Sequence, residues 1–331
     1  MLFMATNRRK NGSGFGDEPQ AGHKFSYLYD YNNQPRGQNA FRETGKRGFA
    51  TALLQELKRL NCEQAIAKPK VGIYLHGYNN EYQESIDEIF DLERSLSPIL
   101  GYAPIIVGFS WPSSGGVINY LSDREQVRDS VGAFTRFLLD IDALATSSER
   151  DCFSTTFCIA HSMGNYFLRK GLEYLSDQLG SPTGRKLFDE TLMMAPDIAA
   201  HDIESNGKGR YIASFSRRVH VYFSKHDVVL TASSAKRFGA NRLGRHGPEN
   251  YGNLPGNVVA IDDKKYANDD AIDGLRDRIG DQVSVHSSHR YHPDILTDAV
   301  HVPASVDRHQ IPERREVLHE GAPPGVHFPL E

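Results

Sequence analysis

Residues 155–170, T-T-F-C-I-A-H-S-M-G-N-Y-F-L-R-K, carry the pattern that decides the fold. Apolar residues up to Ala160 predict a buried strand, and helical spacing begins directly after Gly164. Ser162 lies at the turn between them, and the small residues two positions before and after it allow the backbone to turn tightly. The segment predicts a nucleophilic serine at a helix N-terminus, where free N–H groups stabilise a developing negative charge. By itself the segment leaves open that Ser162 only caps the helix.

The composition is that of an ordinary globular protein. The chain has 331 residues, of which 39% are hydrophobic and 24% are charged, and this balance excludes wholesale disorder. The formal net charge is −4. A nucleic-acid partner usually requires a basic face, so we expect none.

The sequence shows no targeting or membrane-spanning segment. Its longest apolar runs are far shorter than the roughly 20 residues that a membrane helix needs. No basic segment followed by an apolar core is visible at the start, so we expect no signal peptide. Three cysteines are too few for a disulfide framework. These features predict a cytoplasmic protein.

Short apolar runs alternate with helical patterns along most of the chain, which predicts an α/β fold with a mostly parallel central sheet and helices on both faces. We expect an N-terminal extension over residues 1–23, an α/β domain over 24–302 and a Pro-rich C-terminal tail over 303–331. The predicted strands are Val71–Leu75, Ile105–Phe109, Thr155–Ala160, Thr191–Ala195, Val219–Phe223 and Val258–Ile261.

The first of these strands leads into His76-Gly77-Tyr78. In α/β-hydrolases the loop after such a strand supplies one backbone N–H to the oxyanion hole, and the residue after the nucleophile supplies another. We therefore predict the amides of Tyr78 and Met163 as the two donors. An ordinary strand-to-helix turn is the alternative, because glycine and asparagine are common in all turns.

A nucleophilic serine needs a base, and the base needs an orienting carboxylate. The usual chain order in this fold is serine, acid, histidine. The acid commonly follows the second strand after the nucleophile, which selects Asp227. Asp197, one strand earlier, is the alternative acid, or it caps a helix or lines the pocket.

The base is expected after the last predicted strand, in the segment V-S-V-H-S-S-H-R-Y-H-P-D. Its three histidines are His286, His289 and His292. We choose His289 as the base, with His286 as the second choice. His161, next to the serine, is expected to pack against its neighbours.

Several motifs together resemble a bacterial α/β-hydrolase family that is catalogued as a domain of unknown function within the esterase/lipase superfamily. The resemblance spans most of residues 2–300 and implies Ser162, Asp227 and His289 as a catalytic triad. It implies no substrate beyond serine-dependent hydrolysis. The motifs are L-H-G-Y-N-N (75–80), F-S-W-P-S (109–113), A-H-S-M-G-N (160–165), A-P-D-I (195–198) and V-Y-F-S-K-H-D (221–227).

These observations favour a serine hydrolase, specifically a carboxylesterase that cleaves small or medium acyl esters without a cofactor. Trp111, the single tryptophan, is predicted to wall the acyl pocket, with an anchor at the edge of the core as the alternative. Two other hypotheses stay open. One is a binding protein on a hydrolase fold. The other is a metal enzyme that uses the three histidines, together with Asp294.

No Gly-rich phosphate loop of the G-x-x-x-x-G-K-[ST] type occurs in the sequence, which argues against nucleotide hydrolysis. Short basic clusters occur at residues 8–10, 217–218 and 264–265. We expect these clusters to lie on the solvated surface.

Overall fold

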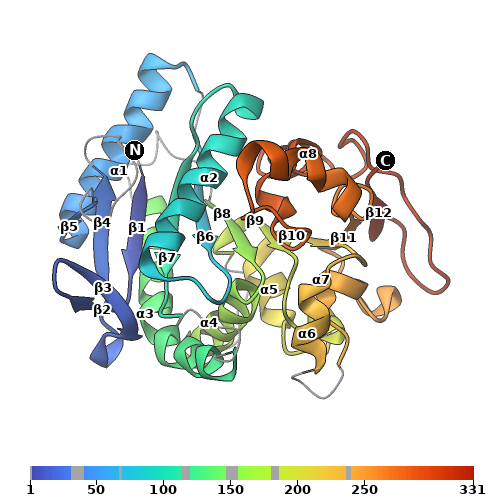
Figure 1. Ribbon diagram of the computed structural model, residues 1–331, viewed down its shortest axis with the longest axis horizontal. Coiled ribbons are helices and arrows are strands. Elements are labelled where there is room, and N and C mark those ends of the chain that lie inside the picture. Colours follow the sequence, from blue (N-terminus) through green and yellow to red (C-terminus); the bar gives the residue numbers. More distant parts are fainter. Residues whose placement is uncertain are drawn as a thin grey trace. The chain divides into compact units, whose positions relative to one another are not determined.

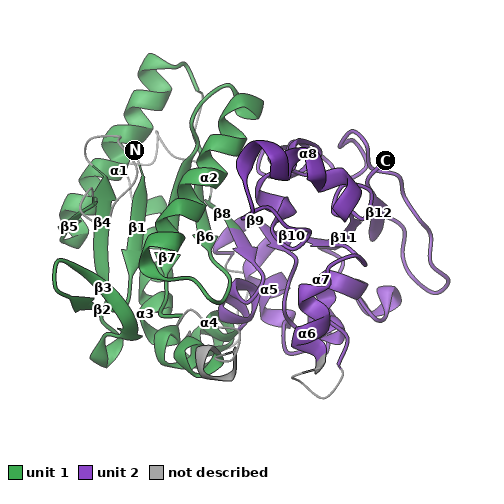
Figure 2. Ribbon diagram, viewed as in Figure 1, with its two compact units in different colours: residues 1–158, 170–180 green, residues 159–169, 181–331 purple. Residues whose placement is uncertain are grey.

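A computed structural model describes residues 2–30, 41–66, 69–113, 120–146, 156–179, 186–235 and 240–331 (Figure 1). The chain divides into two compact units (Figure 2). Unit 1 comprises residues 1–158 and 170–180, and unit 2 comprises residues 159–169 and 181–331.

In unit 1, five strands lie in the order β6, β7, β1, β4, β5. The first three are parallel, whereas β4 and β5 are antiparallel to their neighbours. A separate hairpin is formed by β2 and β3. The bounds are β1 Phe3–Thr6, β2 Arg8–Asn11, β3 Gly14–Pro19, β4 Ser26–Asp30, β5 Phe41–Thr44, β6 Val71–Leu75 and β7 Ile105–Ser110.

Helices cover both faces of the unit 1 strands. Successive residues of a strand point to opposite faces. Gly108 of β7 faces Ile89 of α2, and any side chain larger than hydrogen at position 108 would clash with it. The next residue, Phe109, packs on Phe134 and Phe137 of α3. The helices of this unit are η1 Ala21–His23, α1 Lys46–Glu63, α2 Tyr82–Leu100 and α3 Tyr120–Thr146.

In unit 2, four strands lie in the order β9, β10, β11, β12, and all neighbouring pairs are parallel. Strand β8 (Thr156–His161) runs from unit 1 into unit 2, and α4 (Gly164–Leu179) runs back into unit 1. The strand bounds are β9 Phe188–Met194, β10 Ser216–Phe223, β11 Val258–Asp262 and β12 His327–Pro329.

Short helices connect the unit 2 strands, and the side chains of all four strands are largely buried. The bounds of these helices are η5 Ala200–Ile203, α5 Arg210–Phe215, α6 Val229–Ala235, α7 Leu243–His246, η6 Tyr251–Asn253, α8 Asp269–Ile279, η7 Ser288–Arg290 and α9 Pro293–His301.

The predicted α/β class with mostly parallel strands and helices on both faces is confirmed, and each predicted apolar run contains a strand. The expected boundaries at residues 24 and 302 differ from the structure, because β1 precedes the first and β12 follows the second. Both short strands bury apolar side chains, including Phe3 and Phe328, and therefore belong to the folded units. No helix among the described residues is long and apolar enough to cross a membrane.

Candidate active site

Ser162 lies between the end of β8 and the start of α4, as the sequence predicts. Its φ angle is 53°, in the left-handed region that residues other than glycine rarely adopt. Such local strain persists only where the surroundings enforce it, and it is common at functional sites. Ala160 and Gly164 are the small residues that allow the turn.

Backbone hydrogen bonds hold Ser162 in this conformation. Its N–H donates to the carbonyl of Met194 at 3.0 Å, and its own carbonyl accepts the N–H groups of Asn165 and Asp197. The Asn165 side chain also donates to the carbonyl of Ala160 at 2.7 Å. The Asn165 side chain thus donates hydrogen bonds to carbonyls of the turn that are buried. Sequence reasoning missed its role, although an asparagine three residues after a turn serine is a plausible signal for such a bond.

His286 bridges Ser162 and Asp227. Its Nε2 lies 2.8 Å from Ser162 Oγ, and its Nδ1 lies 2.6 Å from Asp227 Oδ2. A carboxylate only accepts, so Nδ1 carries the proton and Nε2 can accept the serine hydroxyl. The arrangement can therefore remove a proton from Ser162 while the carboxylate stabilises the resulting imidazolium.

The Asp227 carboxylate is fixed at both oxygens. It follows β10 and precedes α6, and its Oδ1 accepts the backbone N–H of Leu230 at 3.2 Å. The Arg245 guanidinium donates to the Asp227 carbonyl at 2.7 Å. Because Oδ1 is used by the first turn of α6, Oδ2 is left to orient the histidine. The predicted serine and acid are thus brought together, with His286 between them.

The choice of His289 as the base is wrong in this geometry. Its Nε2 lies 2.7 Å from Asp263 Oδ2, and both side chains are buried. Although burial opposes it, the charge of Asp263 raises the pKa of His289 above its ordinary value. His289 lies within η7, and its ring contacts Asp263, the residue after β11. His286 precedes η7, and its ring contacts Asp227 in the loop after β10.

His161 holds the backbone of His286. Its Nε2 donates to the His286 carbonyl at 2.9 Å, and its Nδ1 accepts a guanidinium N–H of Arg290 at 3.3 Å. Burial, together with the positive charge of Arg290, lowers the pKa of His161 well below its ordinary value. His161 therefore stays neutral, which its one-donor, one-acceptor pattern requires. The sequence predicted packing here but not this contact with the base.

The remaining candidates in unit 2 have other roles. Asp197 accepts the Ser233 hydroxyl at 2.6 Å and lies 3.4 Å from the Arg242 guanidinium, so it is not the partner of His286. His292 caps α9 by accepting the N–H of Asp294. The three histidines of this segment therefore do not converge. Within the described ranges, no group of three His, Cys, Asp or Glu side chains is arranged to hold a metal ion.

Two predicted site residues lie in unit 1. Tyr78 follows β6 in a bend whose next residue, Asn79, has a φ angle of 61°. Trp111 is fully buried and its indole stacks on the His76 ring, with the centroids 5.1 Å apart. This contact supports the alternative of a core anchor for Trp111. The oxyanion role of Tyr78 and of Met163, which follows Ser162 directly in unit 2, stays a prediction.

Comparison with known proteins identifies relatives of this chain. Residues 55–272, more than half of the chain, match the sequence model of a family described as "Alpha/beta hydrolase of unknown function (DUF900)". An uncharacterized protein of Nostoc sp. (strain PCC 7120) is 28% identical over 178 residues, which cover 46% of this chain and 44% of that protein. The chain thus aligns with less than half of that relative's length. The family match shows that the chain belongs to this α/β-hydrolase family of unknown function.

Proposed function

We propose that this protein is a serine hydrolase that cleaves carboxylic esters through Ser162, His286 and Asp227. The observation that carries the proposal is the bridging of Ser162 Oγ and Asp227 Oδ2 by one imidazole, at 2.8 and 2.6 Å. Both distances allow proton transfer without rearrangement of the side chains. The left-handed backbone of Ser162 supports the same role, because a serine that only capped a helix would not need it.

The proposed reaction begins with attack of Ser162 Oγ on the ester carbonyl. The hydroxyl proton moves to His286 Nε2 as the oxygen–carbon bond forms, and Asp227 stabilises the imidazolium. The bond to the alcohol then breaks, and His286 returns the proton to the departing alkoxide. Water next attacks the acyl carbon and gives a proton to His286. The bond between the acyl carbon and Ser162 Oγ then breaks, His286 returns the proton to Oγ, and the acid is released.

The negative oxygen of each tetrahedral intermediate needs hydrogen-bond donors. We assign this role to the backbone N–H of Met163, at the start of α4, and of Tyr78. The first N–H groups of a helix have no acceptor within the helix, so the Met163 amide is suited to the task. Loss of one such donor commonly costs about 3 kcal/mol of transition-state stabilisation. Small or medium acyl esters are the proposed substrates.

Labelling with a fluorophosphonate probe tests the proposal without knowledge of the substrate. An activated serine displaces fluoride from the probe and forms a stable phosphonyl ester. Mass spectrometry should find the label on Ser162, and Ser162→Ala should carry none. Ser233→Ala, which changes another buried serine of unit 2, is the matched control and should still be labelled. Folded wild-type protein that stays unlabelled, and that also hydrolyses no ester in a panel of acyl chain lengths, would refute the proposal.

A further inference from the structure

An open surface pocket lies at the ends of the unit 2 strands opposite to Asp227. It has a volume of about 400 Å³ and is lined by Lys186, Ser205, Arg210, Ala213, Ser214, Arg217, Pro255 and Asn257. Lys186 precedes β9, Arg217 is the second residue of β10, and Asn257 precedes β11. The catalytic acid follows the other end of β10. Eight residues of strand span roughly 25 Å, so this pocket is remote from Ser162.

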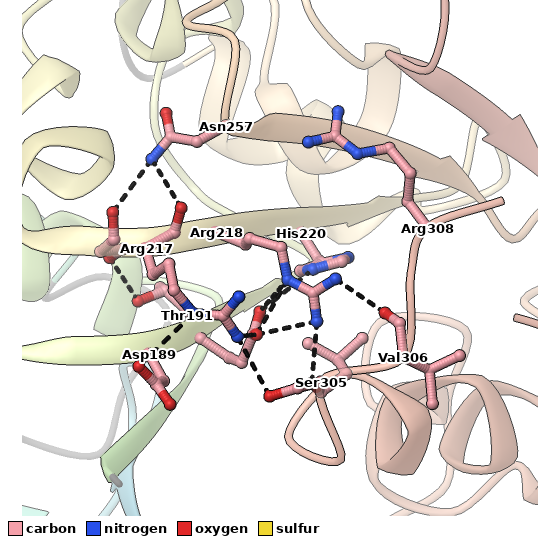
Figure 3. Close-up of polar contacts among 12 residues, drawn as sticks. Asp189, Thr191, Arg217, Arg218, His220, Asn257, Ser305, Val306 and Arg308 are labelled. Atoms are coloured by element: carbon pink, nitrogen blue, oxygen red, sulfur yellow. Dashed lines mark hydrogen bonds and ion pairs between the residues drawn. The ribbon is translucent and has the colours of Figure 1, made fainter. Parts of the chain in front are cut away.

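One arginine that lines the pocket, Arg217, is held in place by contacts with neighbouring side chains. The Arg217 guanidinium contacts Glu190, which is completely buried, donates to Ser305 Oγ at 3.1 Å and lies 3.5 Å from Asp189 (Figure 3). Arg218 binds the same Glu190 carboxylate at 2.8 Å and is itself buried. The expectation that the 217–218 pair lies on the solvated surface is therefore wrong for Arg218. Arg217, whose side chain is 43% exposed, is held at the pocket by its own ion pair with Glu190.

The neutral polar groups of the pocket are already engaged. The Asn257 amide donates to the carbonyls of Ala213 and Ser216 at 2.9 and 3.0 Å. The hydroxyls of Ser205 and Ser214 donate to the carbonyls of Asn253 and Arg210. These bonds shape the pocket, and they leave the cationic side chains as the groups able to bind a ligand.

Two of those cations lack a countercharge. Lys186 donates to the carbonyl of Ser214 at 2.7 Å. Arg210 donates to the carbonyl of Gly207 at 3.2 Å and to the hydroxyl of Tyr211 at 2.8 Å. Within the described part of the chain, neither side chain has a carboxylate within 4.0 Å. The pocket therefore has two uncompensated positive charges beside the fixed guanidinium of Arg217.

We propose that this pocket binds a small phosphorylated compound, with its phosphate between Lys186, Arg210 and Arg217. A phosphate monoester has a charge of about −1.5 to −2 at neutral pH and three terminal oxygens, which matches two free charges and three cationic groups. A monocarboxylate has one charge and two oxygens. The volume of the pocket suits a small molecule. Because the site is remote from Ser162, its ligand is an effector and not the hydrolysed substrate.

Isothermal titration of the full chain with inorganic phosphate, at constant ionic strength in chloride, tests this proposal. We expect saturable binding that becomes about tenfold weaker or more in Lys186→Gln/Arg210→Gln, which removes two charge-assisted contacts but keeps hydrogen-bonding groups. The control Lys265→Gln/Arg278→Gln makes the same change of charge at two exposed positions of unit 2, and it should keep the wild-type affinity within about twofold.

Three results would overturn the proposal: no saturable binding, equal weakening in both double variants, or binding of malonate that is as tight as that of phosphate. Ser162→Ala should bind phosphate like the wild type, so the result does not depend on the proposed esterase activity. Circular dichroism of each variant checks that the fold is retained.

Discussion

Two histidine–aspartate pairs of unit 2, in each of which both residues are buried, differ in one decisive respect. His286 lies 2.6 Å from Asp227, and His289 lies 2.7 Å from Asp263. The first imidazole has a second partner, Ser162 Oγ, on its other nitrogen, whereas no serine contact is found for the second among the described residues. A carboxylate beside a histidine therefore does not identify a base. The third group, a strained serine, distinguishes the proposed catalytic arrangement from a structural ion pair.

The environments of the two pairs agree with this distinction. The His286 side chain is 11% exposed, so a small reactant can reach its edge, while His289 is 2% exposed and Asp263 is fully buried. Buried charges are retained when each compensates the other, and removal of one partner leaves the other uncompensated. We therefore expect substitutions in the first pair to reduce turnover and substitutions in the second pair to reduce stability.

The largest expected effect is that of Asp227→Asn on turnover. The amide cannot stabilise the imidazolium or enforce the correct tautomer, so kcat for ester hydrolysis should fall by about 10⁴-fold. Steady-state kinetics on the best ester of a panel would measure this loss. A decrease of less than about tenfold would show that Asp227 is not the orienting carboxylate.

Asp263→Asn should instead act on stability. It leaves the buried His289 without its countercharge, and the free energy of unfolding should fall by about 3–5 kcal/mol. Urea denaturation would measure the change, with kcat determined per folded molecule at a temperature well below the transition. Unchanged stability together with lost turnover would reverse the roles assigned to the two pairs.

The pH dependence of stability provides a finer test. The pKa of His289 is raised in the folded protein, mainly by Asp263 against the opposing effect of burial, with a further contribution from Asp227. Its ion pair therefore stabilises the fold fully below the unfolded pKa of about 6.5, and this contribution declines as pH rises through the folded value.

The difference in unfolding free energy between wild type and His289→Gln should accordingly be larger at about pH 6 than at about pH 9. Because both proteins contain the other histidines, their contributions cancel in this difference. Urea denaturation at both values measures it. A difference that grows toward high pH would contradict an ion pair between His289 and Asp263.

The fold and half of the site follow from local sequence patterns. Apolar runs predict the strands, and the pattern around Ser162 predicts the turn, because both depend on residues close together in the chain. Asp227 is predictable for a similar reason, since it follows the second strand after the serine. The family match and the observed parallel strands agree with the predicted fold class.

The histidine could not be chosen in this way. His286 and His289 are three residues apart in a segment without a strand, and their partners follow two different strands. Which ring faces which partner depends on where η7 begins, and no spacing rule predicts that position. For the same reason, the sequence did not predict the contact of His161 with the His286 carbonyl or the burial of Arg218 on Glu190. Both contacts join residues that are distant in sequence.

The most direct test of this assignment is the rate at which a fluorophosphonate labels Ser162 in His286→Gln and in His289→Gln, each corrected for its folded fraction. The account predicts a decrease of about 10³-fold or more for His286→Gln, because the serine loses its base, and of less than about tenfold for His289→Gln. A larger loss in folded His289→Gln than in His286→Gln would contradict it and would make His289 the base.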